Sequence, residues 1–241
     1  MTFAEILAEK GAEAGLSFTP LQLEQFSRYY ELLVETNKVM NLTAITEPEE
    51  VAVKHMVDSL LAYEAEMGGK TLADVGTGAG FPGVPLKIYC PELKVTLIDS
   101  LGKRLRFLQQ VIEELGLKGI GIRCEHLRAE DAGRDKKHRE KYDYVTARAV
   151  ARLSVLSEYC LPLAKKGGQF IALKGSKFAE EITEGEAAVK ILGGKILSAE
   201  PVKLPGLDDG RAIIKIAKIK STPAQYPRKA GTPEKQPLGA K

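Results

Sequence analysis

The chain has 241 residues, of which 44% are hydrophobic and 28% are charged. This length suits one large α/β domain with additions, and it is too short for two independent domains of ordinary size. No run of about 18 apolar residues is present, which excludes a membrane-spanning helix, and the acidic start is unlike a signal peptide. Cys90, Cys124 and Cys160 are far apart and odd in number. They predict reduced thiols in a cytoplasm, with no disulfide framework and no metal site.

Charge is distributed unevenly along the chain. Residues 1–70 hold 12 Asp or Glu against 5 Lys or Arg, whereas residues 211–241 hold 8 Lys or Arg against a single Glu. A basic end can lie against a polyanion. Basic tails also occur for solubility alone, so charge by itself leaves both interpretations open.

The first 70 residues read as helices and predict a helical extension, 1–70, packed on the core. Thr19 can cap a helix whose first turn contains Pro20. Apolar residues then recur at helical spacing at Leu23, Phe26, Tyr30, Leu33 and Val34. A second helical stretch spans 48–66, and His55 and Asp58 on it read as an ordinary contact on a helix surface.

From Thr71 onwards, short apolar runs alternate with helical stretches. We expect strands at about 71–75, 94–98, 119–123, 143–147 and 168–173. Helices are expected near 82–90, 101–115, 151–161 and 176–192. This alternation predicts βαβ units and a parallel sheet covered by helices on both faces.

The end of this domain, 71–220, departs from the alternation. Two strand-like runs, 196–204 and 212–219, are joined by a linker too short for a crossover helix, so they should pair antiparallel. A mostly parallel Rossmann-like sheet ending in such a hairpin is typical of class I methyltransferases. The remaining residues, 221–241, form a basic, proline-rich tail that should be flexible or extended along a surface.

A glycine-rich loop between the first strand and the next helix is the strongest motif. Gly76, Gly78 and Gly80 follow the strand directly, which is the register of a methyltransferase. Gly78, Gly80 and Gly83 also form a GxGxxG pattern, which is the dinucleotide fingerprint, but it begins late relative to the strand. We favour the first register, in which Asp74 suits the ammonium group of a methionine moiety.

Three further residues lie where strands end, which is where open α/β sheets bind ligands. Asp99 can accept hydrogen bonds from ribose hydroxyls, although an acid there can also cap a helix. Glu130, in the loop after the third strand, can reach an adenine or be a solvated acid. Arg148 ends the fourth strand and can line the crevice.

Several motifs of related chemistry are missing. The chain has no Asn/Asp-Pro-Pro-Tyr/Phe segment for amino groups and no Pro-Cys pair for attack on pyrimidines. The acceptor should therefore already be nucleophilic. A methyltransferase with another acceptor, a dinucleotide-binding oxidoreductase and an RNA-binding module without catalysis remain alternatives at this point.

Taken together, several segments resemble the RsmG family, also called glucose-inhibited division protein B. The resemblance runs from about residue 20 to 238. It is carried by the segments Asn41-Leu-Thr, Lys54-His-Met-Val-Asp58, Asp74–Gly83, Asp99–Arg104, Arg128–Asp131, Thr146–Leu153, Leu173-Lys-Gly and Tyr226-Pro-Arg-Lys-Ala-Gly-Thr-Pro. The family methylates N7 of a guanine in bacterial 16S ribosomal RNA, with S-adenosyl-L-methionine as methyl donor.

The resemblance implies cofactor contacts at Gly76, Phe81, Ala129, Glu130 and Arg148, to which Gly78 and Asp99 are added on physical grounds. The expected partner is 16S rRNA or a precursor of the small ribosomal subunit, bound by a cytoplasmic, monomeric enzyme. RNA contacts are expected from Arg148, Lys174, Arg228, Lys229 and Lys235. No acid or base is assigned, because guanine N7 carries a lone pair and no proton.

Overall fold

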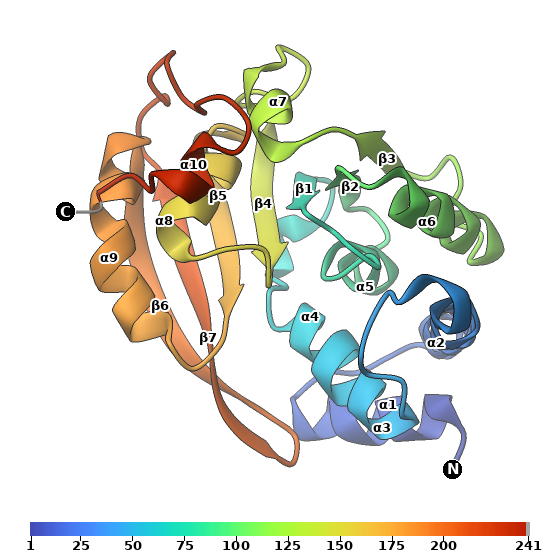
Figure 1. Cartoon of the computed structure of the whole chain (residues 1–241). Coiled ribbons are helices and arrows are strands. Elements are labelled where there is room, and N and C mark those ends of the chain that lie inside the picture. The colour runs from blue at the N-terminus through green and yellow to red at the C-terminus, as the bar shows by residue number, and fades with distance from the viewer. Residues whose placement is uncertain (240–241) are drawn as a thin grey trace.

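The computed structural model describes residues 1–239, and its centre is a seven-stranded sheet in the order β3-β2-β1-β4-β5-β7-β6 (Figure 1). Five strands run parallel: β1 (Thr71–Val75), β2 (Lys94–Asp99), β3 (Ile122–His126), β4 (Tyr142–Arg148) and β5 (Ala164–Lys174). β7 (Leu207–Lys218) pairs antiparallel with both β5 and β6 (Gly194–Leu204). The predicted α/β fold, a mostly parallel sheet that ends in a hairpin, is confirmed.

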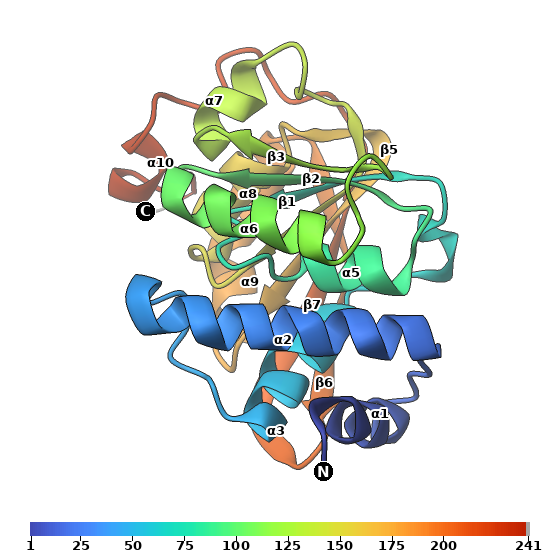
Figure 2. The ribbon, with the colours of Figure 1, turned by 90° about the vertical axis from the view of Figure 1, so that its right-hand side faces the viewer.

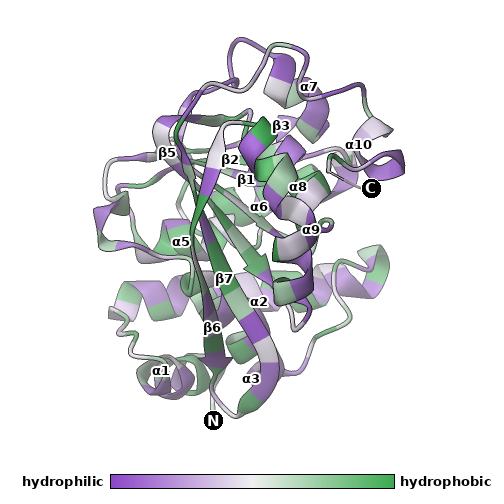
Figure 3. Cartoon of the chain, turned by 90° about the vertical axis from the view of Figure 1, so that its left-hand side faces the viewer, coloured by the Kyte–Doolittle hydropathy of each residue, from purple (hydrophilic) through white to green (hydrophobic). Residues whose placement is uncertain are grey.

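Both faces of the sheet are buried because successive side chains of a strand point to opposite sides. Leu97 faces one hydrophobic cluster and its neighbour Ile98 faces the other. The first cluster includes α5 (Gly83–Tyr89) and α6 (Gly102–Glu114), and the second includes α7 (Ala129–Arg134), α8 (Leu153–Cys160) and α9 (Phe178–Ile191). Hydrophobic colour accordingly runs along the strands in Figure 3, whereas the outer helices carry both colours.

The N-terminal residues form helices, as predicted. They are α1 (Phe3–Glu13), α2 (Pro20–Met40) and a helix made of α3 (Pro48–Val51), a π-helical turn η1 (Ala52–Val57) and α4 (Asp58–Leu60); a 3₁₀ turn η2 (Ala65–Met67) follows. Thr19 and Gln22 form the capping box that starts α2, each side chain accepting the other's backbone N–H. Figure 2 shows α2 lying alongside α5 and α6.

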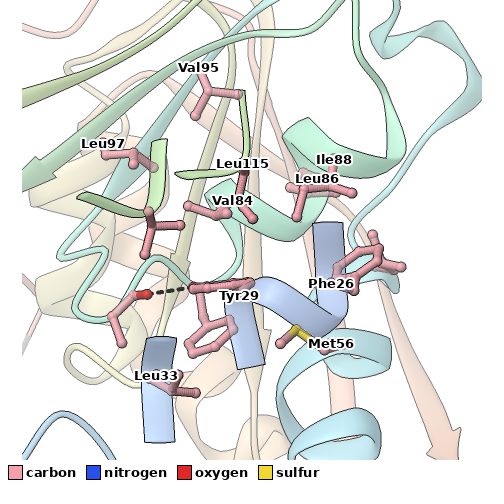
Figure 4. Close-up of a cluster of buried hydrophobic side chains, with 14 of the residues drawn as sticks. Phe26, Tyr29, Leu33, Met56, Val84, Leu86, Ile88, Val95, Leu97 and Leu115 are labelled. Atoms are coloured by element: carbon pink, nitrogen blue, oxygen red, sulfur yellow. Dashed lines mark hydrogen bonds between the residues drawn. The ribbon is translucent and has the colours of Figure 1, made fainter. Parts of the chain in front are cut away.

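Helix α2 reaches the glycine-rich loop through the core. Phe26, Tyr29 and Leu33 are fully buried, and they pack with Met56 and residues of α5 (Figure 4). The Tyr29 hydroxyl donates a hydrogen bond to the Ala79 carbonyl at 2.5 Å. The N-terminal helices therefore share a core with the sheet and support a loop of the candidate site. The domain boundaries at 70 and 220 stay predictions.

Two predicted segments differ in detail. The third strand begins at Ile122 instead of 119, because Gly119 and Gly121 adopt positive φ and form a turn. The tail is held against α7 and α8, and it contains a short helix, α10 (Thr232–Lys235). Within residues 1–239, no helix combines the length and apolar character needed to cross a membrane.

Candidate functional site

A cavity of about 290 Å³ opens at the carboxyl ends of the parallel strands. β1, β2 and β3 contribute side chains or the residues that follow them, and the loop after β4 closes one side. The lining residues are Val75, Gly76, Ile98, Asp99, Ser100, Arg104, Leu127, Arg128, Ala129, Glu130, Ala149, Val150, Tyr159, Gly231 and Glu234. The crevice thus lies where open α/β sheets bind their ligands.

The glycine-rich loop reaches this cavity at Gly76. Gly76 has a φ of 67° and packs so closely that a Cβ there would lie 2.8 Å from Cγ2 of Val150. Gly78, with a φ of 61°, donates its N–H to Asp99 Oδ2 at 2.9 Å. Gly83 lies inside α5, where a Cβ would press on Asp74. Gly76 therefore faces the cavity, whereas Gly83 is needed for packing, as the favoured register requires.

The side chain of Asp74 is hydrogen-bonded to this loop and to the start of α5. Its carboxylate is fully buried and accepts hydrogen bonds from the Gly83 N–H at 2.9 Å and the Thr77 hydroxyl at 2.6 Å. Burial raises the pKa of Asp74 to about 6. Asp74 does not line the cavity. Asp74 accepts hydrogen bonds from the loop's own donors, and its contact with an ammonium group stays a prediction.

The carboxylate of Asp99 accepts backbone hydrogen bonds at both of its oxygens. Its Oδ1 accepts the N–H of Leu101 at the start of α6, and its Oδ2 accepts the N–H of Gly78. The side chain also lines the cavity beside Gly76. Asp99 therefore ties the glycine-rich loop and the residue before α6 to the end of β2. Its contact with a ribose stays a prediction, as do the cofactor contacts of Gly76, Gly78 and Ala129.

Arg148 lies at the end of β4 and turns towards the N-terminal helices. Its Nη1 donates to Asp58 Oδ2 at 2.7 Å and to the Lys54 carbonyl at 3.0 Å. The other Asp58 oxygen accepts from Arg211 Nη1 at 2.8 Å. The guanidinium of Arg148 also lies 4.9 Å from the centre of the Phe81 ring. One buried carboxylate thus joins β4, β7 and the helix at 48–60.

His55 belongs to the same cluster. Its ring stacks on Phe81 at 4.6 Å between centroids, and its Nε2 lies 2.8 Å from the Thr43 hydroxyl. Burial and the neighbouring Arg148 charge lower the pKa of His55 to about 3, so the ring is neutral. The Phe81 ring is buried here and does not line the cavity, so its expected cofactor contact stays a prediction.

The prediction that His55 and Asp58 form an ordinary contact on a helix surface is wrong, because both side chains are buried. A signal for this was present in the sequence. Six of the ten residues from 51 to 60 are apolar: Val51, Ala52, Val53, Met56, Val57 and Leu60. So apolar a helix is mostly buried, and a carboxylate buried with it must be paired.

A second cavity of about 320 Å³ adjoins the first. It is lined by Arg148, Ala149, Leu173, Lys174, Gly175, Ser176, Asp209 and Arg211. Ala149 lines both cavities and has a φ of 54°, which is unusual for a residue with a Cβ. Such strained positions cluster at functional sites. The two cavities thus meet at the residue that follows β4.

The tail forms one wall of the first cavity. Glu130 Oε1 accepts the N–H of Gly231 at 2.9 Å, and Glu234 accepts from the Tyr159 hydroxyl at 3.2 Å. Arg228 makes a two-pronged ion pair with Glu158, whose side chain is fully buried. Of the two predicted states of the tail, the one laid along a surface is observed in the described residues.

The basic residues predicted to contact RNA fall into two groups. Lys174 pairs with Glu181 at 2.6 Å and Arg228 with Glu158 at 2.7 Å, so both already bind carboxylates of the protein. Arg148 is likewise paired with Asp58. Lys229 and Lys235 are exposed on the tail. An RNA contact stays a prediction for all five, and the geometry favours the two lysines.

Comparison with known proteins identifies a family for this chain. The model of the family described as rRNA small subunit methyltransferase G matches residues 22–206. A protein named ribosomal RNA small subunit methyltransferase G from Lactobacillus johnsonii is 52% identical over 238 residues, which cover 97% of this chain and 99% of that protein.

Solved structures share the fold at low identity. A predicted O-methyltransferase from Agrobacterium tumefaciens is similar with a TM-score of 0.51 and 22% identity, over 68% of this chain and 81% of that one. TYW2 from M. jannaschii, in complex with AdoMet, has a TM-score of 0.50 and 16% identity, over 66% of this chain and 71% of that one. These likenesses indicate the fold.

Proposed function

Because the chain belongs to the rRNA small subunit methyltransferase G family, we propose that it transfers the methyl group of S-adenosyl-L-methionine to N7 of a guanine in small-subunit 16S ribosomal RNA. The observation that carries the proposal is the meeting of the two cavities at Ala149. A methyl donor in one cavity and a base in the other would come together at the end of β4.

The first cavity fits the cofactor. Gly76 offers backbone where the chain can approach a ligand closely, Asp99 offers carboxylate oxygens to ribose hydroxyls, and Ala129 begins α7 at the far end. Val75, Ile98 and Leu127 supply apolar contacts. When bound, the cofactor supplies a methyl group on a positively charged sulfur that departs as a neutral thioether.

The second cavity suits the acceptor. Guanine N7 needs no base to activate it, and its neighbour O6 is a hydrogen-bond acceptor. Arg211 lines this cavity, and Asp58 holds it in a fixed orientation. Since no proton has to be removed, the contribution of the protein is to align the base and exclude water. Good alignment can supply up to about 7–11 kcal/mol of a reaction barrier.

The exposed tail lysines, Lys229 and Lys235, would contact the RNA backbone beside the first cavity. Phosphate contacts of this kind set affinity and register without reading sequence. The substrate is either free rRNA or a precursor of the small ribosomal subunit. We place the activity in the cytoplasm and propose that the enzyme acts as a monomer.

The test is transfer of labelled methyl from S-adenosyl-L-methionine to small-subunit rRNA that lacks its native methyl groups, followed by identification of the modified base. Label at guanine N7 is the expected result. Label on another base of the same RNA would overturn the proposed acceptor but leave the assignment of the cofactor intact. Binding of the cofactor without label in any rRNA, free or assembled, would overturn the substrate class.

A further inference from the structure

The residue expected to read the adenine of the cofactor has another partner. Glu130 lies at the end of the cavity formed by the loop after β3, but its Oε1 accepts the N–H of Gly231. The side chain is 5% exposed. This hydrogen bond ties Glu130 to the tail at the end of the cavity.

The tail brings a second carboxylate to the same end of the cavity. Gly231, with a φ of 78°, precedes α10, and Glu234 follows one turn later. Glu234 lines the cavity and accepts a hydrogen bond from Tyr159, which also lines it. Glu234 is itself exposed, so its second oxygen can be reached from the cavity side.

The position of the tail is fixed by hydrogen bonds to the core. Arg228 is anchored on the buried Glu158 of α8 by both its backbone N–H and its guanidinium. Arg134 donates to the Pro227 carbonyl at 2.8 Å, and Arg139 donates to the Tyr226 carbonyl at 2.7 Å. Glu234 is thus held at the cavity by several bonds that precede it in the chain.

The order of residues along the cavity sets the orientation of a bound nucleoside. Gly76 lies after β1, Asp99 after β2, and Ala129 and Glu130 after β3. A nucleoside with its ribose on Asp99 would point its base towards Ala129, Tyr159 and Glu234. The 6-amino group of adenine donates hydrogen bonds, and an ionised carboxylate only accepts them.

We propose that Glu234, carried by the C-terminal tail, accepts a hydrogen bond from the adenine 6-amino group and makes the site select 6-amino over 6-oxo purines. This inference rests on the proposed cofactor. It assigns the tail to the cofactor site, in addition to its role as a basic segment for RNA. Glu130 then acts as a positioning residue, because it holds Gly231 and thereby α10.

The test compares the binding of S-adenosylhomocysteine and S-inosylhomocysteine by calorimetry. The two ligands differ at position 6, where an oxo group replaces the amino group, and at N1, which carries a proton only in the 6-oxo compound. The full chain should prefer the adenosine compound by tenfold or more, since a site built to bond a donor rejects an analogue that lacks it. Glu234→Gln should bring the ratio of the two affinities close to one, because an amide both donates and accepts.

Asp131→Asn is the matched control, because Asp131 is an exposed acid of α7 that does not line the cavity. It should keep the preference of the unaltered chain, and thermal melting should show that both variants fold. An unchanged preference in Glu234→Gln would overturn the proposal. If the unaltered chain bound neither compound, the cofactor assignment itself would fail, and this inference with it.

Discussion

Arg148 and Asp58 are 90 residues apart in sequence, yet Nη1 of the arginine lies 2.7 Å from Oδ2 of the aspartate in a nearly buried ion pair. The pair links the end of β4 to the N-terminal helix, and Arg211 of the hairpin bonds the other oxygen. The helices at residues 48–60 therefore complete the wall of the second cavity indirectly, by orienting the two arginines that line it.

Asp58→Asn should destabilise the fold and lower methyl transfer. The change removes the charge that two partly buried guanidinium groups share, and loss of one partner of a buried pair costs about 3–5 kcal/mol. Denaturant unfolding measures the stability, and single-turnover transfer measures the alignment of the acceptor. Glu113→Gln is the control, because it breaks an exposed ion pair with Lys118 and should leave the Tm nearly unchanged. Equal effects of the two substitutions would contradict the bridging role.

Stability should depend on pH through His55. Its pKa falls from an ordinary 6.5 to about 3 in the folded chain, mainly through burial. Between these values the unfolded chain binds a proton that the folded chain does not, so stability is lost as the pH drops. The loss amounts to about 2 kcal/mol between pH 7 and pH 5. Urea unfolding at several pH values should show this dependence of the free energy of unfolding on pH, and His55→Gln should remove it. Equal dependence in the variant and the unaltered chain would show that His55 is not its source.

Asp74 should act in the opposite direction. Its pKa is raised from 3.8 to about 6 by burial. As the pH falls, the folded chain therefore binds a proton here at a higher pH than the unfolded chain does. Ionisation of Asp74 above pH 6 therefore lowers the free energy of unfolding. At pH 5 the carboxyl is protonated in the folded chain, and this loss is absent. Asp74→Asn keeps an acceptor for the Gly83 N–H and removes this cost, so its stability relative to the unaltered chain should improve between pH 5 and pH 7. A constant difference across that range, from the same urea series, would argue against a buried, shifted carboxyl.

The pattern of apolar residues predicts the sheet and its hairpin, and the glycines after the first strand predict the loop. Local sequence is enough for these features. The pairing of Asp58 does not follow from this local pattern, because its partners Arg148 and Arg211 come from β4 and β7, far along the chain. The sequence leaves two states of the tail open for a related reason. Its sequence has too little apolar surface to fold alone, but buried Glu158 on α8 offers a charge that Arg228 must neutralise. Pairing of this kind depends on tertiary structure, which composition does not encode.

Neighbouring basic residues of the tail should have different roles. Arg228→Ala would leave Glu158 buried without its partner, at a cost of about 3–5 kcal/mol, and would loosen the wall that carries Gly231 and Glu234. The expected result is a lower Tm and weaker binding of S-adenosylhomocysteine. Lys229→Ala changes an exposed side chain, and it should leave both the Tm and cofactor binding as they are.

For RNA binding, the lysine substitutions should have the larger effect and Arg228→Ala the smaller one, when all variants are compared at temperatures where they are folded. Each exposed lysine that contacts a phosphate releases a counterion, so its removal should weaken binding and reduce the slope of log K against log salt by about 1. Lys229→Ala and Lys235→Ala should therefore lower the salt slope for an rRNA fragment, whereas Arg228→Ala should change it little at temperatures where the variant is folded. A reduced slope in Arg228→Ala alone would mean that the arginine leaves Glu158 to bind RNA, and that the tail rearranges on the substrate.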